Sequence, residues 1–238
     1  MTLPVALLAG GLATRLKPIT ATIPKALVEV AGKPFVVHQL ELLRSHGIRR
    51  VVLCVAHLAE QIEAVLGDGR ELGIEVVYSH DGGVLLGTGG ALRLALPLLG
   101  ERFLVLYGDS YLTCDYTDVT RAFEQSGKLG LMTVFRNNGQ YDASNVVYQD
   151  GRIVCYDKTQ TSPAMLHIDY GLGALHADAL AGYPTEGADA RLDLAAVYQD
   201  LLARDQLAGY EVAERFYEIG SPAGLEETRA LLSAKEKL

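Results

Sequence analysis

The sequence predicts an α/β fold with a mixed, mostly parallel sheet that is flanked by helices and carries a small antiparallel elaboration. Two patterns in the 238 residues support this fold. In the first half, short apolar runs alternate with amphipathic segments, as in repeated βαβ units around a parallel sheet. In the second half, strand-like runs follow one another closely, and Asp150-Gly151 between two of them is a strong hairpin signal.

Four apolar runs in the first half have the composition of strands, and the segments between them have helical periodicity. Glycines at 47 and 67 should cap the carboxyl ends of the first two helices. We expect the crossovers between the parallel strands to be right-handed. The expected strands are Val5–Ala9, Val51–Ala56, Glu75–Ser79 and Phe103–Tyr107, and the expected helices are Phe35–His46, Leu58–Leu66 and Gly89–Leu99.

The second half begins with three closely spaced strand-like runs that form the antiparallel part. A further strand is expected at His167–His176, before a helix at Asp193–Arg204 for which Asp193 is a suitable N-cap. A last helix should follow Ser221-Pro222, because proline favours the first helical position. We find no linker, repeat or low-complexity tract, so residues 1–238 are expected to form a single domain. The three runs are Leu129–Arg136, Ser144–Gln149 and Arg152–Lys158.

Composition narrows the possible functions. The formal net charge of −8 argues against a broad nucleic-acid interface, which must neutralise many phosphates. The three cysteines lack any Cys-x-x-Cys pairing, so neither a disulfide framework nor a structural zinc site is indicated. No apolar run reaches the ~20 residues that cross a bilayer, and the first residues lack the charged start of a secretory signal. We therefore expect a cytoplasmic protein that binds neither nucleic acid nor membrane.

Residues 8–25 carry the densest chemical signal. Gly10 and Gly11 follow an apolar strand, the cations Arg15 and Lys25 come after them, and no acidic residue precedes Glu29. Such a local positive field with close backbone access suits a polyanion such as a triphosphate. An ordinary strand-to-helix turn with solvated cations fits the spacing equally well. The glycine spacing matches neither a P-loop nor a dinucleotide fingerprint, which disfavours an NAD-dependent dehydrogenase.

Motifs spread over nearly the whole chain resemble the signature of the sugar-1-phosphate nucleotidyltransferases. Gly-Gly-x-x-Thr-Arg-Leu-x-Pro-x-Thr is followed by Pro24-Lys25 and Lys33-Pro34. The resemblance is strongest to compact members that act on heptose, mannose or N-acetylmuramic acid 1-phosphates. Later motifs occur in the expected order, namely Leu86-Gly87-Thr88-Gly89-Gly90-Ala91, Tyr107-Gly108-Asp109, Tyr156-Asp157-Lys158 and Tyr217-Glu218-Ile219-Gly220-Ser221-Pro222.

This resemblance implies a Rossmann-like nucleotidyltransferase fold and a defined reaction. A phosphate oxygen of a sugar 1-phosphate attacks the α-phosphorus of a nucleoside triphosphate and releases pyrophosphate. The NDP-sugar would serve capsule, lipopolysaccharide, glycan or cell-wall recycling use. Among the triphosphates, the resemblance favours GTP, with UTP next. A homo-oligomer is possible and would have to use the α/β domain itself.

The resemblance also assigns roles to individual residues. Arg15 would neutralise the leaving pyrophosphate, Lys25 would stabilise charge at the transferred phosphate, and Lys158 would clamp the sugar phosphate. The aromatic Tyr170 lies in a predicted strand, where packing is the competing interpretation. The nucleotide-binding residues would be Leu8, Gly10, Gly11, Thr14, Gly87, Thr88 and Gly89, and the sugar-phosphate-binding residues would be Asn145, Lys158, Asp169, Tyr170 and Gly171.

A Mg²⁺ site is implied by two carboxylates. Asp109 follows an apolar strand at its carboxyl end, where open α/β sheets place ligands, although an isolated Asp there is also a common turn residue. Glu218 stands where most members of the family carry an aspartate, and Ala13 stands where a glycine is usual. These departures motivate an alternative function, a catalytically silent regulatory subunit of the same fold that binds nucleotide sugars.

Overall fold

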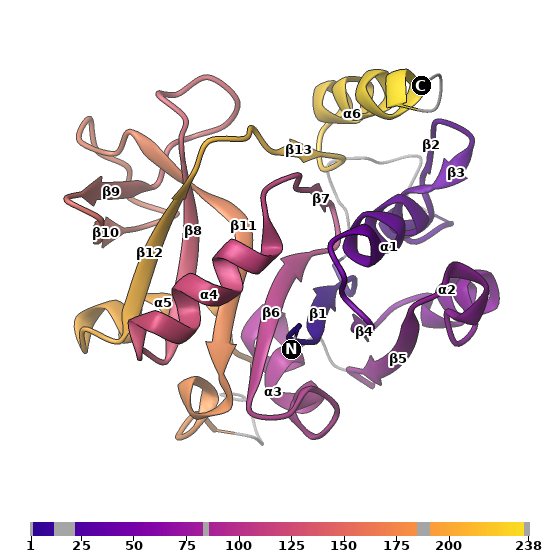
Figure 1. Cartoon of the computed structure of the whole chain (residues 1–238), viewed down its shortest axis with the longest axis horizontal. Helices are drawn as coiled ribbons and strands as arrows, with labels where there is room; N and C mark the ends of the chain where they lie inside the picture. Colours follow the sequence, from indigo (N-terminus) through magenta and orange to yellow (C-terminus); the bar gives the residue numbers. More distant parts are fainter. Residues whose placement is uncertain (1, 12–21, 83–85, 185–190, 236–238) are drawn as a thin grey trace.

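The computed structural model describes residues 2–11, 22–82, 86–184 and 191–235. Within these ranges, one nine-stranded mixed sheet runs through the molecule and helices cover both of its faces (Figure 1). None of the helices in the described ranges is long and apolar enough to cross a membrane. The predicted α/β class is therefore confirmed.

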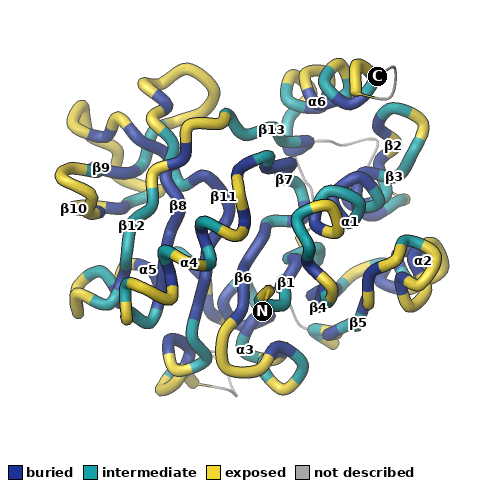
Figure 2. The backbone as a smooth tube through the Cα atoms, viewed as in Figure 1, coloured by how far each residue is buried: buried dark blue, intermediate teal, exposed yellow. Residues whose placement is uncertain are grey.

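The first half forms the parallel part of the sheet. Strand β1 (Val5–Leu8) lies between β4 (Arg50–Val55) and β6 (Arg102–Tyr107), and β5 (Glu75–His80) pairs with β4 at the outer edge. All three pairings are parallel, as predicted. These strands read as nearly continuous apolar runs because helices bury both of their faces. Figure 2 shows the central strands as the most deeply buried segments.

Side chains of each central strand alternate between two layers of core. In β1, Val5 and Leu7 pack in one apolar cluster while Ala6 packs in the other. The first cluster is covered by three helices and the second by two. The first three are α1 (Phe35–Ser45), α2 (Ala59–Leu66) and α4 (Tyr116–Ser126), and the other two are α3 (Gly87–Leu99) and α5 (Leu194–Ala203).

The second half of the chain adds the antiparallel part. The ten-residue strand β11 (His167–His176) pairs antiparallel with β6 on one side and with β8 (Gly130–Arg136) on the other. Strands β9 (Val146–Gln149) and β10 (Arg152–Tyr156) form the expected hairpin. Asp150 and Gly151 have φ of 50° and 75°, the left-handed values that a tight two-residue turn requires.

The sequence prediction lacks two of the longer elements, helix α4 and a strand. Helix α4 has apolar residues at 116, 119 and 123, and Asp115 caps it by accepting the N–H groups of Thr117 and Asp118. Strand β12 (Leu207–Val212) pairs in parallel with β8. Neither segment contains a long apolar run, so a search for apolar runs does not indicate them, although α4 has the spacing of an amphipathic helix. Packing and pairing with the rest of the sheet stabilise them.

The carboxyl-terminal helix α6 (Pro222–Lys235) begins where Ser221-Pro222 predicts it and packs against the amino-terminal third of the chain (Figure 1). A third apolar cluster holds it there, to which Val28, Tyr111 and Ile219 contribute. Short elements complete the fold, namely β2 (Glu29–Val30), β3 (Lys33–Pro34), β7 (Ser110–Tyr111), β13 (Tyr217–Glu218) and the 3₁₀ turns η3 (Lys25–Leu27), η4 (Arg70–Leu72) and η5 (Ala177–Leu180).

Candidate active site

Two pockets lie on either side of the paired carboxyl ends of β1 and β6. Leu8 and Tyr107 are register partners at these ends, and each lines a different pocket. Open α/β sheets place ligands at this edge. The glycine pocket, of 240 Å³, is lined by Leu8, Gly10, Gly11, Cys54, Asp81, Gly87, Thr88, Ala91 and Arg191. The Lys158 pocket, of 340 Å³, is lined by Tyr107, Asp109, Ser110, Asp142, Ala143, Asn145, Lys158, Thr161, Ile168, Asp169, Tyr170, Gly171, Phe216 and Glu218.

The glycine pocket contains five of the residues predicted to bind nucleotide, namely Leu8, Gly10, Gly11, Gly87 and Thr88. A sixth, Gly89, does not line this pocket: it lies in α3, and its N–H donates to the Leu192 carbonyl at 2.9 Å. Thr14, together with Arg15 and the departure at Ala13, lies outside the described residues.

Gly87 is required by the geometry of the pocket wall. Its φ is +75°, and a Cβ atom there would lie 2.5 Å from the Leu192 carbonyl oxygen, too close for any side chain. Thr88 Oγ1 accepts the N–H of Leu194 at 2.8 Å and so ties the start of α5 to the start of α3. The Gly87-Thr88 turn thus holds two helices at this wall of the pocket.

Asp81 and Arg191 line the glycine pocket but were not singled out from the sequence. Asp81 directly follows β5, so it has the same signal, an acid after an apolar strand, that pointed to Asp109. Its Oδ1 atom is buried and contacts no hydrogen-bond donor among the described residues. Burial raises the pKa of the Asp81 carboxyl, and the backbone N–H of Leu86 opposes that rise. A ligand that supplies N–H donors would satisfy this carboxylate.

Lys25 and Asp109 form an ion pair at the carboxyl end of β6. Lys25 Nζ lies 2.7 Å from Asp109 Oδ2, and the two side chains are 16% and 33% exposed. Gly108 allows the turn that places Asp109 close to the end of β1, because a Cβ atom there would lie 2.6 Å from the Leu8 carbonyl oxygen. Both side chains remain partly exposed to solvent, and Asp109 lines the Lys158 pocket.

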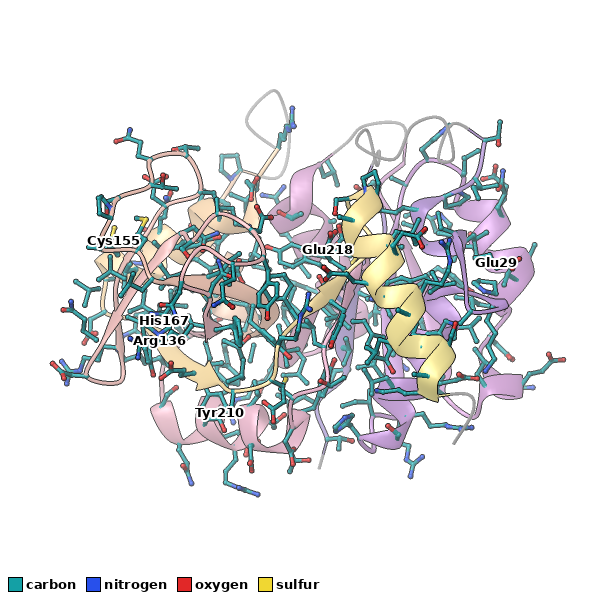
Figure 3. All side chains as sticks on the ribbon, turned by 90° about the horizontal axis from the view of Figure 1, so that it is seen from above. Glu29, Arg136, Cys155, His167, Tyr210 and Glu218 are labelled. Carbon is teal, nitrogen blue, oxygen red and sulfur yellow. The ribbon has the colours of Figure 1, made fainter. Side chains whose placement is uncertain are left out.

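The ribbon of β7 and β13 brings Glu218 to the same place. Glu218 is the register partner of Ser110, and the Ile219 N–H donates to the Asp109 carbonyl at 2.9 Å. The Glu218 carboxylate accepts the Gly220 N–H and the Ser221 hydroxyl, the latter at 2.5 Å. Figure 3 shows Glu218 at the amino end of α6, where the helix dipole favours a negative charge.

Gly220 marks the point on which these three charged side chains converge. A Cβ atom at this position would lie 2.5 Å from Glu218 Oε2, 3.1 Å from Lys25 Nζ and 3.4 Å from Asp109 Oδ2. Residue 220 therefore has to be glycine for the three groups to keep these positions. The sequence motif around Glu218 contains this glycine, but its reason is visible only in the structure.

In the Lys158 pocket, both oxygens of a buried carboxylate accept a hydrogen bond. Asp169, whose side chain is 6% exposed, accepts the Gly171 N–H at 3.1 Å and the Tyr156 hydroxyl at 3.2 Å, and it lies 3.5 Å from Lys158 Nζ. Burial, together with the charge of Asp169, raises the pKa of Tyr107 and Tyr156, so both phenols stay protonated and can donate.

All five residues predicted to bind the sugar phosphate line this pocket, but they differ in what they offer. Asn145 Oδ1 accepts the Asp169 N–H at 2.9 Å, and Gly171 has φ of +99°, which brings its backbone close to Ser110. Tyr170 is 2% exposed, and its ring packs near Phe135 and Phe216. Its main contribution is therefore to the core, as the packing interpretation expects.

No group of three or more His, Cys, Asp or Glu side chains that could hold a metal ion exists among the described residues. Asp109 and Glu218 are two carboxylates beside Gly220. Mg²⁺ in phosphoryl-transfer sites is held by one or two carboxylates together with substrate phosphates. The donor set at Gly220 therefore fits Mg²⁺ in the presence of a phosphate substrate.

The fold and the two pockets define an α/β protein with a ligand site at the carboxyl edge of its sheet. A family model described as nucleotidyl transferase matches residues 5–144, more than half of the chain. The chain belongs to the nucleotidyl transferase family. The matched region includes the glycine pocket's strand ends and the Lys25–Asp109 pair.

Named relatives agree with this membership. The chain is 37% identical over 153 residues to the mannose-1-phosphate guanylyltransferase catalytic subunit beta of Danio rerio, covering 62% of this chain and 42% of the relative. It is 40% identical over 124 residues to the N-acetylmuramate alpha-1-phosphate uridylyltransferase of Neisseria meningitidis, covering 52% of each. The matches thus span about half or less of these relatives.

A solved structure shares the fold over almost the full chain. HddC from Yersinia pseudotuberculosis, solved in complex with GMP-PN, superposes with a TM-score of 0.80 at 23% identity. The superposition covers 97% of this chain and 100% of HddC. The strands β9 to β12, which lie beyond the residues that the family model matches, therefore also have a counterpart in a solved fold.

Proposed function

We propose that this protein transfers a nucleoside monophosphate from a nucleoside triphosphate to a sugar 1-phosphate, which gives an NDP-sugar and pyrophosphate. The observation that carries the proposal is the Lys25–Asp109 pair at the strand ends that separate the glycine pocket from the Lys158 pocket. The activities for which the relatives from Danio rerio and Neisseria meningitidis are named support the same reaction class.

The proposed arrangement places the nucleotide in the glycine pocket and the sugar phosphate in the Lys158 pocket. An oxygen of the sugar phosphate attacks the α-phosphorus, a new P–O bond forms, and the bond to the bridging oxygen of the β-phosphate breaks. Lys25 neutralises charge on the transferred phosphate, and Lys158 holds the incoming phosphate. Positioning and charge neutralisation account for most of the rate enhancement in such transfers.

We propose that Mg²⁺ serves this reaction, held by Asp109 and by Glu218. When bound, the ion would neutralise phosphate charge and orient the oxygens of the triphosphate. Glu218 already accepts two hydrogen bonds at the start of α6, which fixes the direction of its carboxylate. Because a carboxylate has about four lone-pair sites, these two bonds leave capacity for a cation.

We propose GTP as the preferred triphosphate, with UTP next. The carboxylate of Asp81 lines the glycine pocket, and its Oδ1 atom contacts no donor in the described part of the chain. Guanine presents two adjacent donors, N1–H and the N2 amino group, which a carboxylate can accept together, whereas uracil presents a single N3–H between two carbonyl oxygens. The GMP-PN bound to HddC is a guanine nucleotide and supports the same preference.

Replacing Asp81 with asparagine should relax this base preference. The amide loses one acceptor and gains a donor, so we expect the ratio of kcat/KM for GTP over UTP to fall by roughly 10- to 100-fold, the effect of one or two charge-assisted hydrogen bonds. Competition between the two triphosphates, read by product chromatography, measures the ratio directly. An unchanged ratio would place base selection elsewhere in the site.

The proposed activity is tested by pyrophosphate release. The five common nucleoside triphosphates are combined with glucose, mannose, heptose and N-acetylmuramic acid 1-phosphates in the presence of Mg²⁺. We expect at least one pair to give turnover and GTP to give the highest rate. Nucleotide-sugar binding without pyrophosphate release at any Mg²⁺ or Mn²⁺ concentration would instead support the catalytically silent regulatory subunit.

Gly220→Ala should lower kcat by roughly 10- to 100-fold while the protein still folds. The added methyl group would displace the Glu218, Lys25 and Asp109 side chains, and misplacement by about 1 Å costs up to ~100-fold in rate. The Tm of the variant should stay within a few degrees of that of the parent protein, because the displaced groups are side-chain ends. A variant with full turnover would show that the three groups need not meet at this point.

A further inference from the structure

We infer that the sugar 1-phosphate accepted by this protein carries no second acidic group, so the acceptor is a neutral sugar 1-phosphate and not a sugar acid. The inference rests on the proposed function and names the substrate class of its acceptor site. It follows from the charges that line the Lys158 pocket and from the partners that these charges already have.

The described lining of this pocket carries more negative charge than positive charge. It contains four carboxylates and one ammonium group, namely Asp109, Asp142, Asp169, Glu218 and Lys158. Lys25 compensates the charge of Asp109 from outside the lining. With Asp169 balanced by Lys158, the charges of Asp142 and Glu218 remain. A Mg²⁺ ion at the Gly220 end would be matched by the phosphates that it binds.

Lys158, the cation of this lining, already has an anionic partner within the pocket. Its ammonium group lies 3.5 Å from Asp169 Oδ2 and 3.4 Å from the Tyr107 hydroxyl, above the rings of Tyr107 and Tyr156. Asp169 is almost fully buried, so removing its cation would leave an uncompensated buried charge. Lys158 can therefore approach the phosphate of the acceptor only while it stays near Asp169.

Asp142 also lines the Lys158 pocket, in a loop that hydrogen bonds hold in place. Asn137, which is fully buried, donates from Nδ2 to the Asp142 carbonyl at 2.6 Å and to the Ser144 hydroxyl at 3.1 Å. Its Oδ1 atom accepts the N–H of Tyr141. The Asp142 carboxylate accepts the N–H of Ala143 at 2.7 Å. This local network fixes the backbone that carries one of the acids of the pocket lining.

Among the described residues, no basic side chain forms an ion pair with Asp142. Arg215 stacks on the rings of Tyr141 and Tyr217, at 3.9 and 4.5 Å, and pairs with Glu227. Arg136 is exposed at the end of β8. Neither arginine lines the pocket. A carboxylate on the sugar would therefore meet like charges, whereas sugar hydroxyls could donate to Asp142.

The remaining lining suits the rest of a neutral sugar. Phe216 and Ile168 offer apolar surface for the C–H face of a pyranose ring, and Asn145 and Thr161 offer polar groups for its hydroxyls. The pocket thus combines one phosphate clamp, hydroxyl partners and an apolar wall. The described residues add no cation for a carboxylate.

The test compares acceptors with and without a carboxylate. Glucose 1-phosphate is compared with glucuronic acid 1-phosphate, and N-acetylglucosamine 1-phosphate with N-acetylmuramic acid 1-phosphate, using the best triphosphate. In the pair whose neutral member is the better substrate, we expect kcat/KM for the acidic member to be at least roughly 100-fold lower than for the neutral member. The reason is that like charges repel strongly in a partly enclosed site. Equal values would overturn the inference and leave the proposed function intact.

Asp142→Asn should lower the ratio of kcat/KM for the neutral over the acidic acceptor by roughly 10-fold, because one repelling charge is removed. Asp118→Asn is the matched control, since Asp118 lies on α4 in a surface ion pair with Arg121, and it should leave the ratio unchanged.

If no acceptor gives turnover, the proposed function fails. In that case, calorimetry still compares the affinities of the protein for glucose 1-phosphate and glucuronic acid 1-phosphate. A weaker affinity for the acid would support the inference, and equal affinities would refute it.

Discussion

Lys25→Met should lower kcat by roughly 10³- to 10⁴-fold with little change in the fold. Methionine keeps the length and apolar stem of lysine but removes the ammonium group that lies 2.7 Å from Asp109 Oδ2. Preorganised cations at transferring phosphates are worth several powers of ten in rate, because they act where negative charge develops. Steady-state pyrophosphate release measures the loss of kcat. The affinity for the triphosphate, measured by calorimetry, should fall much less than kcat.

A second ion pair in the chain provides the matched control for this variant. Lys128 Nζ lies 2.7 Å from Asp205 Oδ1, the same separation as in the Lys25 pair, but it lines neither the glycine pocket nor the Lys158 pocket. Lys128→Met should therefore leave kcat within about twofold, as expected for a surface pair. If Lys25→Met retains parental turnover in a folded protein, Lys25 has no role at the transferred phosphate.

Asp109→Asn should cost roughly 10³-fold in kcat and raise the Mg²⁺ concentration needed for half-maximal activity. The amide keeps the shape of the side chain but loses the negative charge that both Lys25 and a divalent cation require. Asp109 is held by the Gly108 turn and by the Ile219 N–H on its carbonyl, so its position should not depend on its charge. A Mg²⁺ titration of the initial rate measures both effects.

Asp205→Asn is the corresponding control, because it neutralises the acid of the matched surface pair. It should change neither kcat nor the Mg²⁺ dependence. A parental Mg²⁺ dependence in Asp109→Asn would contradict the proposed metal role even if kcat falls. The Lys25→Met/Asp109→Asn double variant should lose less than the sum of the two free-energy effects, since the two residues act on the same phosphates.

Much of the fold could be predicted from local patterns. The parallel strands and α1 to α3 appear within a few residues of their predicted ends, because their apolar runs are long and bounded by glycines. The Asp150-Gly151 hairpin follows from two residues that tolerate positive φ. The helix α4 and the strand β12 contain no long apolar run, so apolar runs do not indicate them, and the strand β8 with which β12 pairs lies far earlier in the chain.

The sequence by itself determined the family, the order of the motifs and the chemical type of most site residues. Motifs identify residues that must be present, because the chemistry needs a cation, a carboxylate or a glycine at a given point of the chain. They also led to Glu218 and Gly220 as members of one motif. They contain no information on distance between motifs.

Only the tertiary structure decided which of these residues meet. The pairing of β7 with β13 brings Glu218 beside Asp109, and the packing of α6 on the amino-terminal third sets Gly220 between them and Lys25. The structure also shows that Tyr170 packs mainly in the core, unlike the neighbouring residues of the Lys158 pocket. It further reveals Asp81 and Asp142 as residues that line the two pockets. The physical reason is that long-range strand pairing and apolar packing fix these distances, and neither leaves a local pattern in the sequence.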